Sequence, residues 1–75
     1  MIKKNPYQVK LGTVVRHTRK SLKMNQKVFS RKMHLTQAQI SRLETGYQGF
    51  RFDVLCRTAR ILGSKPSKLL AAAGL

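Results

Sequence analysis

The chain has 75 residues, enough for one domain with one small hydrophobic core. It carries 16 Lys and Arg residues against two acidic residues, which gives a formal net charge of +14. Its hydrophobic fraction of 41% is close to ordinary globular usage, which excludes a chain that is disordered by composition. Self-repulsion of this size destabilises a compact fold, so we expect a polyanionic partner. Nucleic acid is the first candidate, and an anionic membrane surface is the second.

Several other classes of protein are excluded or disfavoured by the sequence. The single Cys56 excludes an intramolecular disulfide, and its apolar neighbours predict a small core residue rather than a nucleophile. No apolar run approaches the ~20 residues that span a bilayer, and the basic start is followed by no apolar stretch of a signal peptide. A cytoplasmic location, with no membrane partner, is therefore expected.

The residues that commonly carry catalysis or bind metals are few. His17 and His34 have no Cys or acidic partners at ligand spacing, so no metal site is expected. The two carboxylates, Glu44 and Asp53, both have structural explanations given below, which leaves no acid–base pair. We expect no enzyme activity, no cofactor and no small-molecule ligand.

The predicted helices begin with a segment over residues 6–21. Asn5 can cap this helix, and Pro6 suits its first position. Residues at helical spacing predict its inward face, namely Leu11, Val15, Thr18 and Leu22, with Val14 beside them.

Two short helices follow, over residues 26–33 and 37–45. Asn25 and Thr36 can cap them, and Gly46 supplies the left-handed residue that ends the second of them. The inward residues are Phe29 and Met33 in the first of the two and Ile40 and Leu43 in the other.

A fourth helix is predicted over roughly residues 53–62 and a fifth from Pro66. Gly63 would end the fourth helix, and no strand, long linker or internal repeat is expected. The inward residues are Leu55, Ala59 and Leu62 in the fourth helix, and the fifth includes Leu69 and Leu70.

The second and third helices are separated only by the three residues 34–36. Two short helices joined by such a turn, in a basic all-helical domain, form the geometry that sets a helix into the major groove of DNA. The alternative is an ordinary αα-corner in a small bundle. Charge and spacing together favour the DNA-binding version.

From about Leu11 to Leu70 the chain resembles the phage repressor and Cro-like family of helix-turn-helix domains, also called the xenobiotic-response-element or lambda-repressor-like family. The resemblance implies an all-α, compact five-helix DNA-binding domain over residues 6–75, preceded by a short basic arm over residues 1–5. It rests on Leu11-Gly12, Asn25-Gln26, Phe29 to Met33, Leu35-Thr36, ISRLETG from Ile40 to Gly46 and LCRTARILG from Leu55 to Gly63.

Two departures from the family pattern stand out. The family usually has Gly in the turn between the second and third helices, where this chain has His34. A left-handed backbone there is tolerable for His, although it costs more than for Gly. Before the fourth helix the family often reads N-P-S, and this chain reads Gly49-Phe50-Arg51. That helix also loses the usual Ser/Thr cap, and we expect Asp53 to serve its positive end instead.

The resemblance implies an ion pair between Arg19 of the first helix and Glu44 near the end of the third. A partly buried, bidentate pair would lock the recognition helix to the first helix. The alternative is a solvated surface pair worth less than about 1 kcal/mol. The scarcity of acids favours the structural pair.

With Ile40 and Leu43 inside, the outward face of the third helix is predicted to read bases. Gln can bond adenine, Arg can fork onto guanine, and the Ala methyl can pack on a thymine methyl. The family reads bases from the same helix positions, although a generic polar surface is the alternative. The predicted base-reading residues are Gln37, Ala38, Ser41 and Arg42.

Phosphate contacts are expected on both sides of this helix. The start of the second helix offers free backbone N–H groups as an anion site. The alternative for Tyr47 is packing against the fourth helix. The alternative for Thr45 is that it is only the last residue of the third helix and makes no phosphate contact. The predicted phosphate residues are Asn25, Gln26 and Lys27 on one side and Thr45, Tyr47, Gln48 and Arg51 on the other.

The arm over residues 1–5 either reaches into a groove or is a frayed terminus, and the second is more common. Most of the remaining cations are expected to be solvated and to add non-specific affinity. The apolar fifth helix and tail suggest a homodimer interface, with docking onto the first helix or a disordered tail as the alternatives. A dimer would set two recognition helices about 34 Å apart, matching half-sites one turn apart.

Taken together, these features predict a sequence-specific, double-stranded DNA-binding transcriptional regulator. The simplest version is a phage or mobile-element repressor that binds a palindromic operator as a dimer with its third helix in the major groove. One alternative is an antitoxin-like DNA-binding protein whose main partner is a toxin protein. Another is a cationic membrane-active peptide, which the lack of Trp disfavours.

Overall fold

The computed structural model describes residues 5–75, and these residues form five α-helices without any strand. The prediction of an all-α, five-helix fold is therefore confirmed, and the predicted bounds of the first three helices are those observed. Of the basic arm expected at residues 1–5, only Asn5 lies within the described residues. The helices are α1 (Pro6–Ser21), α2 (Gln26–Met33), α3 (Gln37–Thr45), α4 (Phe52–Ile61) and α5 (Pro66–Ala72).

Side-chain caps fix the starts of the first three helices. The side-chain oxygens of Asn5 and Asn25 each accept a hydrogen bond of 2.8 Å from a backbone N–H of the following turn. Thr36 and Gln39 form a reciprocal capping box, with hydrogen bonds of 3.1 and 2.8 Å. Each cap satisfies a backbone donor that a helix start would otherwise leave unpaired. The caps are local in sequence, which is why these starts could be predicted.

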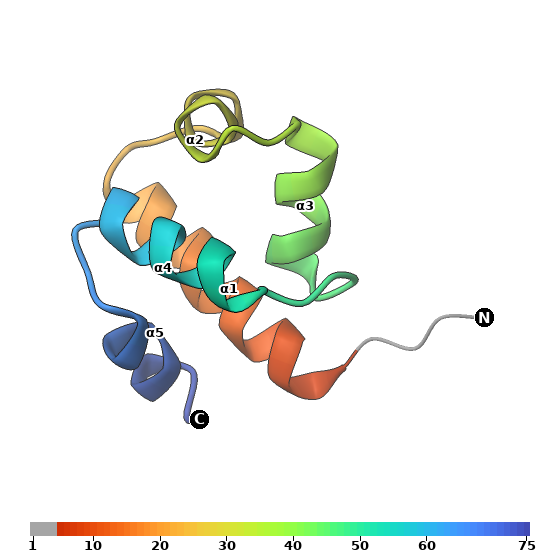
Figure 1. Ribbon diagram of the computed structural model, residues 1–75, viewed down its shortest axis with the longest axis vertical. Helices are drawn as coiled ribbons and strands as arrows, with labels where there is room; N and C mark the ends of the chain where they lie inside the picture. Colours follow the sequence, from red (N-terminus) through yellow and green to blue (C-terminus); the bar gives the residue numbers. More distant parts are fainter. Residues whose placement is uncertain (1–4) are drawn as a thin grey trace.

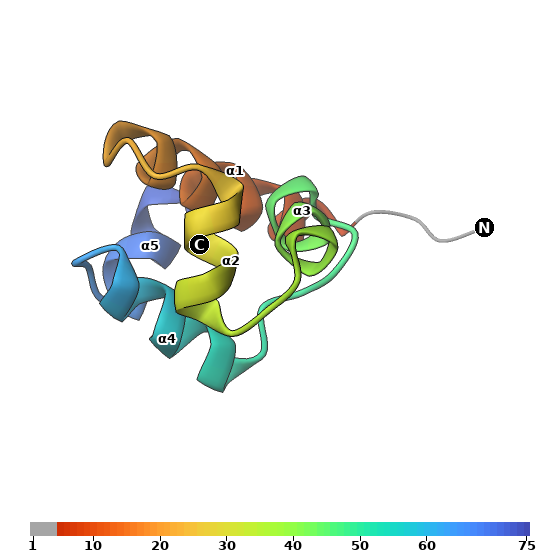
Figure 2. The same ribbon diagram turned by 90° about the horizontal axis from the view of Figure 1, so that it is seen from above.

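The helices pack around one small core (Figures 1 and 2). α1 packs against α3 and α5, while α2 packs against α3 and α4, and α4 also contacts α5. α3 and α5 consequently lie on opposite sides of the molecule (Figure 1). No helix within residues 5–75 has both the length and the apolar character that crossing a membrane requires. The buried apolar residues are Leu11, Val15, Phe29, Met33, Ile40, Leu43, Leu55, Ala59, Leu62, Leu69 and Ala73.

Two glycines allow α1 and the end of α3 to approach closely. A Cβ atom at Gly12 would collide with the backbone carbonyl oxygens of Leu43 and Glu44, so the backbone of α1 lies directly against α3. Gly46 ends α3 with a φ of 86°, and a Cβ atom there would collide with Val9 of α1. The position of the last turn of α3 is thus set by backbone contact with α1.

Three details of the predicted core and of α4 were wrong. Leu22 was expected to face inward, but it is half-exposed because the chain turns away there at the C-cap of α1. Cys56 was expected in the core and is only partly buried. α4 begins at Phe52, one residue earlier than predicted, with Arg51 at its N-cap and no side-chain cap. Asp53 lies in the first turn of α4, where its charge favours the positive helix end.

The turn between α2 and α3 has a left-handed backbone at His34, the position where the family usually has Gly, with φ of 57° and ψ of 39°. It is closed by hydrogen bonds from the His34 N–H to the Arg31 carbonyl, 3.1 Å, and from the Leu35 N–H to the Ser30 carbonyl, 2.9 Å. A residue with a side chain is strained in this conformation, whereas glycine is not. The chain therefore holds a stored strain at the centre of its helix-turn-helix.

Replacing His34 with Gly should raise the free energy of unfolding by roughly 0.5–1 kcal/mol, because relief of the left-handed strain exceeds the added entropy of the unfolded chain. Chemical denaturation of the two proteins measures the difference. His17, exposed in the middle of α1, provides the matched control. His17→Gly should lower stability by about 1 kcal/mol, as glycine does inside a helix. A loss of stability in both variants would contradict the strain at position 34.

Candidate nucleic-acid interface

The outward face of α3 is not covered by any other part of residues 5–75. The four residues predicted to read bases are all exposed, whereas Ile40 and Leu43 between them are buried. α3 forms one edge of the molecule in both views (Figures 1 and 2). Within residues 5–75 the side chains of these four residues make no hydrogen bond, so their polar groups are available to a ligand. They are Gln37, Ala38, Ser41 and Arg42.

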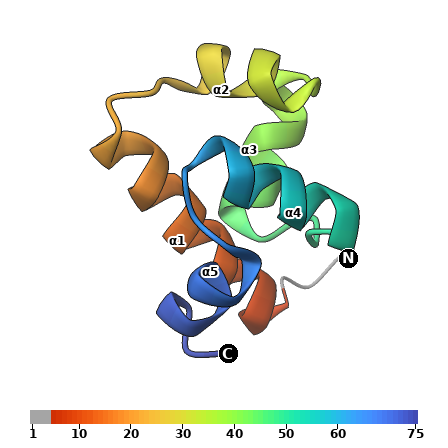
Figure 3. The ribbon, with the colours of Figure 1, turned by 60° about the vertical axis from the view of Figure 1, so that its left-hand side comes forward.

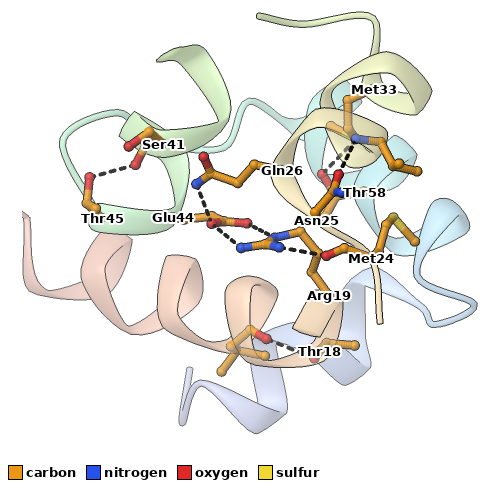
Figure 4. A network of polar contacts seen from close by, with 12 residues as sticks. Thr18, Arg19, Met24, Asn25, Gln26, Met33, Ser41, Glu44, Thr45 and Thr58 are labelled. Atoms are coloured by element: carbon orange, nitrogen blue, oxygen red, sulfur yellow. Dashed lines mark hydrogen bonds and ion pairs between the residues drawn. The ribbon is translucent and has the colours of Figure 1, made fainter. Parts of the chain in front are cut away.

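A buried ion pair holds the inward side of α3 against α1. The Arg19 Nε donates to Glu44 Oε2 at 2.6 Å, and Nη2 donates to Oε1 at 3.1 Å (Figure 4). The two side chains are only 5% and 1% exposed. The third guanidinium nitrogen, Nη1, donates to the backbone carbonyl of Met24 at 2.6 Å. One guanidinium thus joins α1, the turn that follows it and the end of α3, in the bidentate geometry that makes such pairs strong.

Gln26 extends this network to the start of α2. Its Nε2 donates to Glu44 Oε1 at 3.1 Å, so Gln26 lies beside the ion pair (Figure 4). The sequence predicted a phosphate contact for Gln26 and did not reveal this structural role. A second amide hydrogen of Gln26 is left over, and the backbone N–H groups of Gln26 and Lys27 have no partner within the described chain. The phosphate contact at the start of α2 stays a prediction, and the network holds that start in a fixed position relative to α3.

The segment after α3 carries the second group of predicted phosphate contacts. Tyr47, Gln48 and Arg51 are exposed there, and the backbone N–H groups of Tyr47 and Gln48 both donate to the Arg42 carbonyl. Thr45 is half-buried, and its hydroxyl donates to the Ser41 carbonyl at 2.7 Å. Because that proton is used inside the helix, Thr45 could meet a phosphate only by giving up the bond.

Gln8 holds this segment to α1, a role that the sequence did not indicate. With its amide in the orientation that satisfies both neighbours, Nε2 donates to the Gly46 carbonyl at 3.2 Å and Oε1 accepts from the Gly49 N–H at 3.3 Å. Gln8 lies one helical turn before Gly12, on the side of α1 that meets α3. A glutamine in a helix is usually solvated, so only that position could have suggested the contact.

These contacts place one exposed helix between two anchored segments. Gln26 holds the start of α2 to the ion pair, and Gln8 holds residues 46–49 to α1. Exposed cations accompany each part, with Lys27 beside the first segment, Arg42 on the helix and Arg51 beside the second. A protruding helix flanked by cations, with free backbone donors at the start of α2, is an arrangement that fits a groove and its two phosphate strands.

The family-level comparison agrees with this geometry. A family model described as Helix-turn-helix matches residues 15–69 of the chain. The chain belongs to the phage-repressor-like, xenobiotic-response-element family of helix-turn-helix domains. The resemblance predicted from its motifs is therefore confirmed. No curated protein is similar enough in sequence to count as a relative.

Solved structures share the fold at low sequence identity. The clp gene regulator ClgR of Corynebacterium glutamicum superimposes with a TM-score of 0.86 at 19% identity, over 91% of this chain and 88% of its own. The restriction-modification controller protein C.AhdI of Aeromonas hydrophila gives 0.78 at 21% identity, over 83% and 94% of the two chains. HppE, solved with Fe(II) and substrate, matches at 0.77 and 21% identity, over 83% of this chain but 36% of its own. At these identities the likeness shows the helical fold alone.

Glu44→Gln should lower the free energy of unfolding by roughly 3 kcal/mol, because it leaves the buried Arg19 guanidinium without a counter-charge. Asp53→Asn is the matched control, since it removes the other carboxylate from an exposed site at the start of α4 and should lower stability by less than about 1 kcal/mol. Thermal and denaturant unfolding of both variants test this. Equal and small effects would show that the ion pair does not hold the fold.

Proposed function

We propose that the protein is a sequence-specific, double-stranded DNA-binding transcriptional regulator, and that it acts as a repressor by occluding promoter DNA. The observation that carries this proposal is the exposed face of α3, braced from behind by the buried Arg19–Glu44 pair. The likeness to two proteins described as a gene regulator and a controller protein supports regulation. Binding rather than catalysis is proposed because Glu44 is fully engaged in the network.

In this proposal α3 lies in the major groove and its side chains select the sequence. Arg42 can fork onto guanine, Gln37 can bond adenine, and Ala38 can pack on a thymine methyl. The start of α2 and the segment after α3 then meet the flanking phosphates, which set position rather than sequence. The anchors at Gln26 and Gln8 would keep those two segments at a constant distance from the bases.

Dimer formation through α5 and the tail belongs to the same proposal. Leu69 and Ala73 are buried in the domain's own core, so they are not available to a partner. Ala71, Ala72 and Leu75 remain exposed and could form a small apolar contact with a second copy. Such a two-fold arrangement would place the recognition helices about one turn of DNA apart and favour a palindromic operator.

Selection of bound sites from a pool of random duplex DNA tests the proposal directly. A regulator of this kind should enrich a palindrome whose half-sites lie one helical turn apart, about 10 base pairs from centre to centre. An enriched single half-site would retain base reading and reject the dimer. No enrichment over the starting pool would reject sequence-specific binding.

On the selected duplex, Arg42→Ala should lose roughly 1–3 kcal/mol of discrimination at one base pair, because a forked contact to guanine is removed. Lys27→Ala is the matched control, since it removes one positive charge beside the start of α2. It should weaken binding about equally on all sequences and reduce the salt slope by roughly one unit. Titrations on the selected site and on single base-pair changes measure both quantities. Uniform weakening by Arg42→Ala would show that this residue reads no base.

A further inference from the structure

A second group of cations lies away from α3. Their segments are the end of α1 and the turn after it, the end of α4, and the start of α5, which come together on the side of the molecule shown in Figure 3. α3 lies at the opposite side in Figure 1. We define the rear basic surface as the exposed residues Lys20, Lys23, Arg60, Lys65 and Lys68.

No acidic side chain neutralises the rear basic surface. Glu44 is buried in its pair with Arg19. Asp53 lies at the start of α4, seven positions before Arg60, a separation of about 10 Å along the helix axis. Within residues 5–75 the side chains of the rear basic surface make no hydrogen bond and no ion pair. Within the described chain, its positive charge is therefore balanced only by water and dissolved salt ions.

DNA bound at α3 would leave most of this repulsion unrelieved. The domain measures 31 × 25 × 22 Å, and the end of α4 and α5 lie across it from α3, whereas Lys23 lies two residues before Asn25 at the start of α2. Interactions between exposed charges are largely screened beyond about 8 Å at physiological salt. More exposed cations lie on this surface than the three (Lys27, Arg42 and Arg51) that flank or line α3. The domain's positive charge thus exceeds what one duplex at α3 can use.

Lys23 illustrates that the side chains of the rear basic surface contribute little to the stability of the fold. Its backbone is left-handed, with φ of 57°, in the turn after α1, where glycine would be free of strain. The side chain is exposed and makes no polar contact within the described chain. Unlike glycine, a lysine at this position adds a positive charge that is exposed to solvent.

We propose that the rear basic surface binds the phosphate backbone of a second DNA duplex, so that one molecule can bridge two duplexes. A duplex presents one negative charge per about 1.7 Å, which matches a surface made only of cations. A membrane surface is disfavoured, because insertion needs a broad apolar face and Leu22 alone is a large exposed apolar side chain among these segments. The inference rests on the proposed function only in that α3 holds the first duplex.

The test uses two duplexes of about 30 base pairs, three helical turns, one immobilised and one fluorescent, both of one unselected sequence. The wild-type chain should retain the fluorescent duplex on the immobilised one. The triple variant Lys20→Gln/Lys23→Gln/Arg60→Gln should retain at least about tenfold less, and its capture should depend less on salt, by roughly two to three units of slope. Its affinity for a single duplex should fall no further than that of Lys23→Gln alone, because Lys23 lies two residues before Asn25, in the segment proposed to meet a phosphate of the first duplex. These three positions leave α5 and the proposed dimer contact untouched.

The matched control is Lys10→Gln/Arg31→Gln/Lys32→Gln, which lowers the net charge equally at exposed sites outside both surfaces. It should retain the second duplex nearly as well as the wild type. Equal loss in both triple variants would overturn the proposal, because total charge would then explain bridging. Loss of binding to anionic vesicles with unchanged duplex capture would also overturn it, in favour of a membrane surface. Failure to enrich a selected site rejects the proposed function and leaves this result independent, since the duplexes are unselected.

Discussion

One buried guanidinium joins α1, the turn before α2 and the end of α3. Arg19 contacts Glu44 of α3 and the Met24 carbonyl before α2, and Glu44 in turn accepts from Gln26. Burying two charges is expensive, so such a pair is weak evidence for net stability. Removing either partner leaves the other buried and unpaired, which is strongly destabilising. The network also connects the end of α3 to the start of α2 through Gln26.

The extreme charge of the chain gives this contact its importance. With two acids against 16 bases, Glu44 has no acidic substitute nearby, and few surface ion pairs are possible. Stability must come from the small core, the helix caps and the close approach of Gly12 to α3. A bound polyanion would relieve the repulsion and stabilise the fold by mass action. Folding and nucleic-acid binding are thus coupled through charge, even where no binding residue belongs to the core.

The sequence predicted the parts of this structure that depend on local chemistry. The caps at Asn5, Asn25 and Thr36 act within a few residues, so the first three helices could be placed, whereas α4 has no side-chain cap and its start was misplaced by one residue. The family resemblance supplied the Arg19–Glu44 pair. The contacts of Gln26 and Gln8 join segments that are far apart in the chain, and a glutamine in a sequence does not indicate which residue it will contact. Such contacts follow from packing, which spacing along the chain does not report.

In the proposed function, a small recognition face on α3 and an excess of cations would divide the task of binding. The side chains exposed on α3 can distinguish bases, but four residues on one short helix supply limited affinity. The surrounding cations supply attraction that is independent of sequence and falls steeply with salt. Pairing two recognition helices, or holding a second duplex behind the first, raises the effective concentration of the partner without any new base contact. Because both proposed devices act away from α3, they would let affinity change through the rear of the domain while sequence choice stays with α3.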